Sequence, residues 1–575
     1  MRRFLPALAA GLVLADSSVV TLALPEILRS LDATVAGVAW VLTAFNIALA
    51  VAAIPAARLA PKPAYAGGLV IFAAACLVCA KATSLEMLIA GRVVQGVAGA
   101  AVVAAALALV RAGDDPDPRV PSAGLRTWAL AGVLGAVLGP AAGGLLTEYL
   151  SWEAMFALQA PVALLAIGGL LGVGVLQRDD GSGRPAFGPL LALAFLSAAL
   201  TAALFLLVVM LIEGWRYGPA GAAVAVSVMP VAAILARPLE ARIPVAAAAG
   251  AGTVAVAGGL VALGLLPDAS WWWLVAPQAL IGFGLGAALP ALTTVAVPHV
   301  TTLAGPASWT IMARHAGVVV GLLLLTPVFT ADLDTQQDRT ERAGLAVLLD
   351  APIGLEAKID LAQKLADTVT AADGRLPDLA PAFTGVDGDP QVINAIADTL
   401  DDQLDRAGTA AFSRSLQLAG LLALLALIPL LFTTGLARGA ALAGAGVAAL
   451  IGGGLAIGYV ASGGGTYEPT ATRNPCGARE RPKSDAQYDD VQRVLLSVLD
   501  GGACKLKISR EELLLNLVDP DTRRTLSEDE LADGLRAGVT RARDDGTLGF
   551  VAATALQLAL STGATDEVIG QLLDR

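Results

Sequence analysis

The sequence contains very little histidine, cysteine or charge for its length. Its 575 residues include only two histidines and four cysteines, and 15% of them are charged, whereas 56% are hydrophobic. Both histidines, His299 and His315, lie in or beside apolar stretches, so the hydrophilic regions cannot build a histidine-based triad or metal site. We therefore expect a protein that is not an enzyme and that has no metal site and no cofactor.

A basic patch is also missing. The net charge is −11, and region 331–411 alone holds 16 acidic against 6 basic residues. Region 463–575 is acidic too, with 19 acidic against 14 basic residues. The rest of the chain is mildly basic and has no basic tail, so we expect no nucleic-acid partner.

Long apolar runs dominate what is present, and runs of about 20 residues are long enough to cross a bilayer as helices. The sequence therefore predicts an all-α polytopic membrane protein. The predicted spans are 4–25, 38–58, 64–80, 85–110, 124–147, 152–176, 187–212, 218–236, 243–266, 271–297, 305–329, 412–433 and 437–460.

The spans fall into two sets of six, which predicts two helical halves of the kind common in transporters. The halves are 1–176 and 187–433, joined by a polar cytoplasmic linker at 177–186. Region 331–411 is then an acidic insert of short amphipathic helices between the eleventh and twelfth spans. The helix at 437–460 is an extra, thirteenth span.

Region 463–575 is predicted to be a small helical domain. Ser509–Glu512 and Ser527–Glu530 each match a capping box, in which a serine and a glutamate satisfy the first turn of a helix. The apolar segment "FVAATALQLALSTG" is expected to be the helix around which the others pack.

Lysine and arginine concentrate in the loops that are inside when the N-terminus is cytoplasmic. We therefore expect a cell-membrane protein with a cytoplasmic N-terminus and with the insert and the C-terminal domain outside. Cys476 and Cys504 would then form one disulfide, while Cys76 and Cys79 in "CLVC" read as small buried hydrophobes. A cleaved signal peptide is the competing interpretation of the first span, against which Asp16 and Pro25 argue.

Charged residues inside the predicted spans are the candidate functional residues, because an ionised group in the bilayer is costly without a partner. Asp16 and Arg92 lie at compatible depths in the first and fourth spans, and Asp16 is a candidate for taking up and releasing a proton. A permanent structural ion pair is the alternative. Arg314 and His315 form a second cluster, for which the alternative is an interfacial position.

The fifth predicted span carries small residues at a spacing of four. Gly135, Gly139 and Gly143 therefore share one helix face, where they allow another backbone to come close. Pro140 lacks an amide hydrogen, which favours a bend.

These segments together resemble the multi-span drug:proton antiporter branch of the major facilitator superfamily. The resemblance rests on "LADSSVVTLALPEI", "WVLTAFNIALA", "GRVVQGVAGA", "LGPAAGG" and "GPASWTIMARHAGVVVG", and covers about 1–330 and 412–433. It implies alternating access, a role for Arg92 in proton transfer, and family positions at Gln95, Pro140, Gly144 and Arg314. The loop after the second span departs from the family pattern, with Pro61 where an aspartate is expected and Ala57 where a glycine is expected.

The resemblance therefore implies a proton-coupled exporter of small amphiphilic or drug-like molecules, driven by the proton gradient. Its partners would be the substrate, protons and membrane lipid, together with an extracytoplasmic partner for the C-terminal domain. The alternative is a non-transporting membrane receptor or scaffold that binds through that domain.

Overall fold

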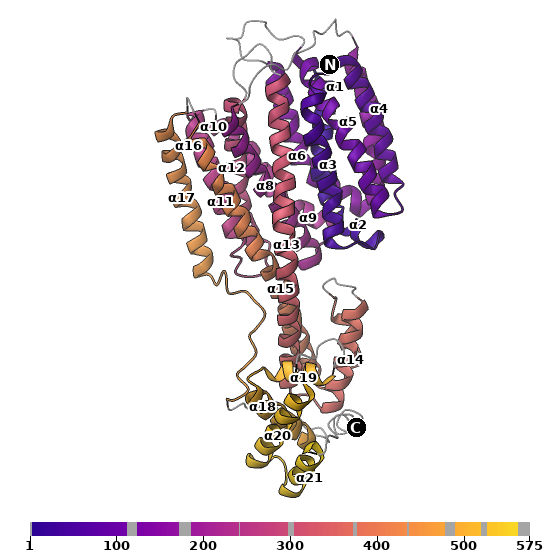
Figure 1. The fold of residues 1–575 in the computed structure, drawn as a ribbon, viewed down its shortest axis with the longest axis vertical. Coiled ribbons are helices and arrows are strands. Elements are labelled where there is room, and N and C mark those ends of the chain that lie inside the picture. Colours follow the sequence, from indigo (N-terminus) through magenta and orange to yellow (C-terminus); the bar gives the residue numbers. More distant parts are fainter. Residues whose placement is uncertain are drawn as a thin grey trace. The chain divides into compact units, whose positions relative to one another are not determined.

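The computed structural model describes residues 3–111, 123–171, 186–240, 242–296, 304–371, 377–433, 436–477, 489–518 and 526–561. Throughout these ranges the regular structure is helical (Figure 1). Most of the predicted linker 177–186 lies outside the described residues. The chain divides into two compact units. We call 1–333 with 408–467 the membrane unit and 334–407 with 468–575 the hydrophilic unit.

The first half of the membrane unit follows the predicted spans closely. Its helices are α1 (Phe4–Thr21), α2 (Leu24–Ser30), α3 (Val35–Ala56), α4 (Pro61–Ala80), α5 (Leu85–Arg111), α6 (Ala123–Tyr149), α7 (Trp152–Ala166) and the 3-10 turn η1 (Ile167–Leu170).

The second half is interrupted more often. Its helices are α8 (Phe187–Val209), the π turn η2 (Met210–Gly214), α9 (Pro219–Val226), α10 (Val228–Glu240), α11 (Val245–Leu263), α12 (Trp272–Ala296), α13 (Ala304–Asp350), α15 (Pro390–Leu425) and α16 (Leu427–Leu431). The predicted eighth span is thus split into α9 and α10 at Ser227, whose hydroxyl donates to the carbonyl of Ala223.

Twelve helices in the described part of the chain are long and apolar enough to cross a membrane. They include α17 (Arg438–Ala461), which corresponds to the predicted extra span. The predicted span 124–147 lies on α6, a continuous helix of 27 residues. The all-α polytopic fold class is therefore confirmed.

Helix α17 packs on α11 through small residues. A Cβ at Gly258 would lie 2.9 Å from the Cα of Gly452, and a Cβ at Gly444 would collide with the carbonyl of Ala247. The opposite side of α17 exposes large apolar side chains such as Leu450, at 79% exposure. A helix with one small-residue face and one bulky apolar face suits a position between protein and lipid.

The insert differs from the expectation of separate short helices. Helix α13 continues to Asp350, past the predicted end of the eleventh span at 329, and α15 begins at Pro390, before the predicted start of the twelfth span at 412. The reason is local, because the stretch after Pro327 in α13 contains no further proline and its polar residues favour helix. Among the described residues of the insert, only α14 (Leu355–Ala371) and the 3-10 turn η3 (Ala380–Phe383) are separate pieces.

The insert and the C-terminal region share one unit, although the sequence analysis treated them as separate regions. Arg510 links the two regions, because its guanidinium donates to Asp350 of the insert at 2.9 Å and to Glu511 of the C-terminal region at 3.0 Å. The remaining helices of this unit are α18 (Asp489–Leu506), α19 (Arg510–Val518), α20 (Glu528–Asp544) and α21 (Phe550–Ser561).

Both predicted helix starts have capping contacts. Ser527 and Glu530 form a complete capping box at α20, and Ser509 accepts from the amide of Glu512 at α19. The structure also joins Cys476 to Cys504 in a disulfide. The apolar helix α21, by contrast, is not the centre of the unit. It buries Ala553 and Leu560 but exposes most of its large side chains, so the prediction that the others pack around it is wrong.

Candidate functional site: a buried ion pair and its neighbours

The strongest polar feature of the membrane unit is an ion pair between α1 and α5. A guanidinium nitrogen of Arg92 contacts Oδ2 of Asp16, and both side chains are completely buried. The helices bring them together as the depth argument predicted. Burying two charges is costly unless each is well paired, so this pair marks a specialised site.

Arg92 has further contacts that hold it in place. Its Nη1 also donates to Oε1 of Gln95 at 2.9 Å, and its Nε donates to the carbonyl of Val41 on α3 at 3.1 Å. The guanidinium carbon lies 4.2 Å from the ring centroid of Phe45, a cation–π geometry. Among the described residues, Oδ1 of Asp16 and Nη2 of Arg92 have no hydrogen-bond partner. The pair therefore has spare hydrogen-bonding capacity on both sides.

Gln95 links the ion pair to the two cysteines of α4. Its Nε2 donates to the sulfur of Cys76 at 3.0 Å, and the thiol of Cys79 lies 3.4 Å from its Oε1. Both cysteines are buried, as the sequence analysis expected of small hydrophobes. They also complete the hydrogen bonds of Gln95, which the sequence alone did not indicate.

The glycine face of α6 lies against α1. A Cβ at Gly135, Gly139 or Gly143 would collide with α1 at Gly11, Ser18 or Val19, respectively. Gly144 points elsewhere, because its Cβ would lie 2.5 Å from the carbonyl of Pro219 on α9. Helix α6 therefore touches the helix of Asp16 on one face and the second half on another.

Pro140 lies inside the continuous helix α6 and is buried. The bend that its missing amide hydrogen favours stays a prediction.

The second predicted cluster does not join the ion pair directly. His315 on α13 is hydrogen-bonded through Nδ1 to Oδ1 of Asn46 on α3 at 2.6 Å. Arg314 is partly exposed and makes no hydrogen bond or ion pair with the described residues. The two neighbours thus have different surroundings.

Asn46, Ser17 and Phe45 were missed by the sequence reasoning. Asn46 is fully buried, and its amide reaches both the carbonyl of Leu42 and the hydroxyl of Ser17. A signal was available, because Asn46 is a lone amide in the apolar segment "WVLTAFNIALA". Such a polar residue in a span needs a partner.

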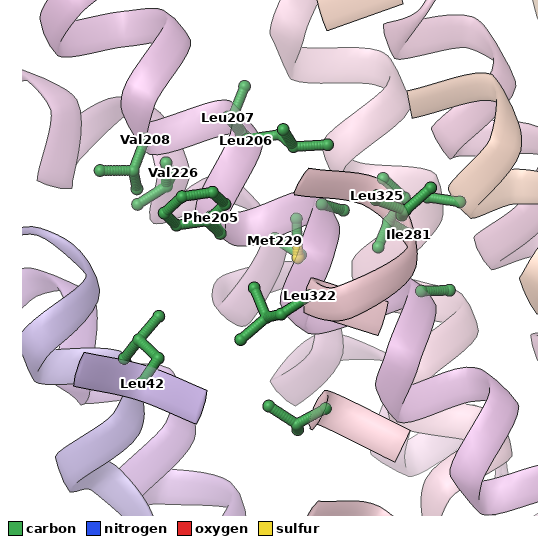
Figure 2. Close-up of a cluster of buried hydrophobic side chains, with 14 of the residues drawn as sticks. Leu42, Phe205, Leu206, Leu207, Val208, Val226, Met229, Ile281, Leu322 and Leu325 are labelled. Atoms are coloured by element: carbon green, nitrogen blue, oxygen red, sulfur yellow. The ribbon is translucent and has the colours of Figure 1, made fainter. Parts of the chain in front are cut away.

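A large apolar cluster joins the two halves beside this site. Figure 2 shows Leu42 of the first half with Phe205, Val208 and Val226 of the second half. At the end of the bundle where α6 meets α9, Oε2 of Glu148 accepts from the amide of Ala220 at 2.7 Å. The halves are therefore in contact at this end of the bundle.

A bundle of membrane-length helices around a buried ion pair is an arrangement that suits a membrane transport protein. The model of the Major Facilitator Superfamily matches residues 7–323, which is more than half of the chain. The chain therefore belongs to the Major Facilitator Superfamily, as its motifs suggested.

Curated relatives support the multidrug efflux branch of this family. The puromycin resistance protein pur8 of Streptomyces alboniger is 38% identical over 178 residues, which are 30% of this chain and 34% of the relative. The methylenomycin A resistance protein of Bacillus subtilis is 30% identical over 250 residues, or 41% of this chain and 51% of the relative. The chain thus aligns with between a third and a half of the length of these relatives.

One solved structure supports the fold. A bacterial homologue of the human lysosomal transporter Spinster, in an inward-facing and occupied conformation, superposes with a TM-score of 0.50 at 15% identity. The match covers 74% of this chain and 96% of that one. At such low identity the similarity concerns the fold alone.

Proposed function

We propose that this protein exports small amphiphilic or drug-like molecules in exchange for protons, by alternating access between its two halves. The observation that carries the proposal is the buried pair of Asp16 and Arg92. A carboxylate at this position is the group best suited to bind a proton in one conformation and release it in the other.

The contacts suggest how a proton would act. When Asp16 is protonated, Arg92 keeps Gln95 and the Val41 carbonyl as partners but loses its counter-charge. An uncompensated buried charge costs about 3–5 kcal/mol, which favours a rearrangement that rehydrates or re-pairs the arginine. Protonation of Asp16 thereby drives a conformational change.

The glycine face of α6 offers a path for that change. Helix α1 carries Asp16 and lies against Gly135, Gly139 and Gly143, while Gly144 lies against α9 of the second half. Backbones packed this closely move together more readily than they separate. A movement of α1 would therefore also move α6 and change the contact of α6 with α9 of the second half.

The proposed orientation places the N-terminus in the cytoplasm and the hydrophilic unit outside the cell membrane. Two independent features support it, namely the distribution of lysine and arginine and the disulfide between Cys476 and Cys504. The hydrophilic unit would then be available to an extracytoplasmic partner. Maleimide labelling of the two cysteines in intact cells, with and without reductant, tests this orientation.

The substrate class rests on the relatives named above, a puromycin resistance protein and a methylenomycin A resistance protein. The energy source would be the proton gradient, with no bound cofactor.

The direct test is efflux from liposomes that contain the purified protein and a panel of amphiphilic dyes and antibiotics. We expect export that requires a pH gradient and that Asp16→Asn abolishes. Glu26→Gln is the matched control, because Glu26 is a half-exposed carboxylate of the same half, paired with Arg29 at 3.7 Å. Gradient-dependent flux that survives in Asp16→Asn would reject Asp16 as the coupling residue. Absence of flux across the panel would favour the receptor or scaffold alternative.

A further inference from the structure

Among the described residues, a hydrogen bond deep inside the membrane unit joins its two halves. It runs between Nδ1 of His315 on α13 and Oδ1 of Asn46 on α3, at 2.6 Å. Asn46 is completely buried and His315 is 8% exposed. A polar contact so well shielded from water is strong while intact and costly to leave unmade.

The direction of this bond follows from its neighbours. Nδ2 of Asn46 donates to the carbonyl of Leu42 at 2.8 Å, and a carbonyl can only accept. The amide oxygen therefore faces His315, whose Nδ1 carries the hydrogen and donates it. This leaves Asn46 with a fixed orientation between the two halves.

His315 belongs firmly to the second half. Two glycines just beyond it, Gly317 and Gly321, pack so tightly on α8 that a Cβ on either would collide with the carbonyl of Ala194 or Ala198. Helix α13 is therefore closely packed on α8 at this level. Because α13 is anchored in this way, the bond to Asn46 crosses from one half to the other.

Asn46 in turn lies beside the ion pair. Its Nδ2 also approaches the hydroxyl of Ser17 at 3.4 Å, and Ser17 directly follows Asp16 in α1. A short polar chain thus runs from the neighbour of Asp16 through Asn46 to His315. The surrounding apolar contacts, such as those of Leu42 with the second half, have no preferred direction, so these surfaces can slide past one another. A hydrogen bond requires a particular distance and angle, so it is lost when the halves move.

We propose that Asn46 and His315 form a link between the halves that stabilises the conformation seen here and that is broken and remade in each transport cycle. The proposal rests on the alternating-access function above. Asn46 and His315 are positioning residues in this scheme. They act on the equilibrium between conformations and not on the substrate.

The test measures the conformation without requiring transport. Thr147 on α6 is buried at the end where Gly144 and Glu148 meet α9, and Thr147→Cys is a nearly isosteric reporter of whether that end is closed. The labelling rate of Thr147→Cys by N-ethylmaleimide is measured in liposomes, against the parent chain with its buried Cys76 and Cys79. We expect Asn46→Leu and His315→Leu each to raise this rate about fivefold, the factor that corresponds to a hydrogen bond of about 1 kcal/mol.

Three further variants separate the link from general loosening. The double variant Asn46→Leu/His315→Leu should label no faster than either single variant, because all three lack the same bond. His315→Gln retains a side-chain donor and should label close to the parent rate. Thr326→Val is the matched control, because it removes a buried hydroxyl of α13 that has no described partner, and it should leave the rate unchanged.

Two results would overturn the link. One is an unchanged labelling rate in the single variants, and the other is additive effects in the double variant. Neither depends on substrate or a pH gradient, so the outcome is independent of the efflux assay. Faster labelling of the variants, together with no proton-driven efflux by the parent protein, would support the link and reject the proposed coupling. Proton-driven efflux together with unchanged labelling would support the coupling and reject the link.

Discussion

The two halves of the membrane unit use the same backbone contacts but differ in charge. In the first half, a Cβ at Gly96 of α5 would lie 2.5 Å from the carbonyl of Phe45 on α3. In the second half, Gly282 of α12 makes the equivalent close approach to the carbonyl of Met229 on α10. Gly96 and Gly282 therefore occupy corresponding positions, from which other residues of the two halves can be matched.

The residue four positions before each glycine shows the difference. Arg92 donates through Nε to Val41, four residues before Phe45, at 3.1 Å. Gln278 donates through Nε2 to Ala225, four residues before Met229, at 3.0 Å. The second half thus has a neutral amide where the first half has a guanidinium, on the same backbone acceptor.

The counter-charge is absent as well. Helix α8 of the second half corresponds to α1 in its glycine contacts, since α13 packs on it as α6 packs on α1. The sequence of α8, from Phe187 to Val209, contains no charged residue. The comparison indicates that similar glycine contacts pack the helices within each half, whereas the fully buried ion pair of α1 and α5 has no counterpart on α8 and α12.

The largest expected effect comes from making the first half resemble the second. Arg92→Gln leaves Asp16 buried without a cation, and we expect it to lose about 3–5 kcal/mol of stability and all proton-driven transport. The double variant Asp16→Asn/Arg92→Gln should recover most of that stability but no transport. Thermal unfolding in detergent, together with liposome efflux, measures both quantities.

Either of two results would break this comparison. Arg92→Gln could prove as stable as the parent, or the double variant could retain gradient-dependent transport. A stable Arg92→Gln variant would mean that Asp16 does not need Arg92 as a counter-charge. Gradient-dependent transport in the double variant would mean that another residue couples transport to protons.

The converse change is expected to have the next largest effect. Gln278→Arg puts a cation into the second half, where α8 offers no carboxylate, at a cost of about 2.5–3.5 kcal/mol on insertion scales. Gln278→Met keeps the volume and loses one hydrogen bond, so it should cost only about 1 kcal/mol. Yield and unfolding temperature of the two variants give the comparison, and equal values would show that the second half tolerates charge as well as the first does.

The glycine contacts test the shared scaffold. Gly143→Ala and Gly321→Ala would each drive a methyl group into a backbone carbonyl, of Val19 or Ala198, and we expect each to cost about 1–3 kcal/mol. Gly453→Ala on α17 is the matched control, since a Cβ there meets nothing within 4 Å, and it should gain up to about 1 kcal/mol from helix propensity. A clear difference between Gly143→Ala and Gly321→Ala in unfolding temperature would argue against equivalent packing in the halves.

The sequence predicted some of these features better than others, for physical reasons. Hydropathy and glycine spacing depend on residues close together in the sequence, so the sequence predicts the spans and the close-packed face of α6. The positions of Asp16 and Arg92 along their spans are also local information, and they were enough to predict that the two residues could pair. The partners of Gln95 and Asn46 depend on how helices rotate about their axes, which no local pattern records. The equivalence of Arg92 and Gln278 could not be predicted for the same reason. It is seen only because the two side chains donate to backbone carbonyls at corresponding positions of the two halves.

The error over α21 has a related cause. Apolar residues occur all around this helix, and such a pattern is typical of a helix buried on every side. In the structure, α18, α19 and α20 bury smaller apolar faces against one another through Leu499, Leu513 and Leu531. Composition therefore indicated a core, but it could not indicate which helix forms it.

The smallest expected effect, counted per pH unit, extends the comparison of buried charges to the hydrophilic unit. Lys358 on α14 is 5% exposed, and its ammonium donates to the carbonyl of Leu349 at 2.6 Å. Burial lowers the pKa of Lys358 to about 8; Arg510 also lowers it, whereas Asp350 and Asp489 act against the shift. The ammonium group of Lys358 can lose its proton, so deprotonation removes the cost of burying its charge.

The sign of the pH dependence follows from proton binding. Between about pH 8 and the ordinary lysine value of 10.5, the unfolded chain holds a proton at Lys358 that the folded chain has released. Local stability should therefore rise with pH across this window, by at most about 1.4 kcal/mol per unit, and Lys358→Met should flatten the rise. Hydrogen exchange of α14 amides in the full chain, corrected for intrinsic rates, measures it, with the half-exposed Lys364→Met as the control. A slope that persists in Lys358→Met would assign the titration to a group other than Lys358.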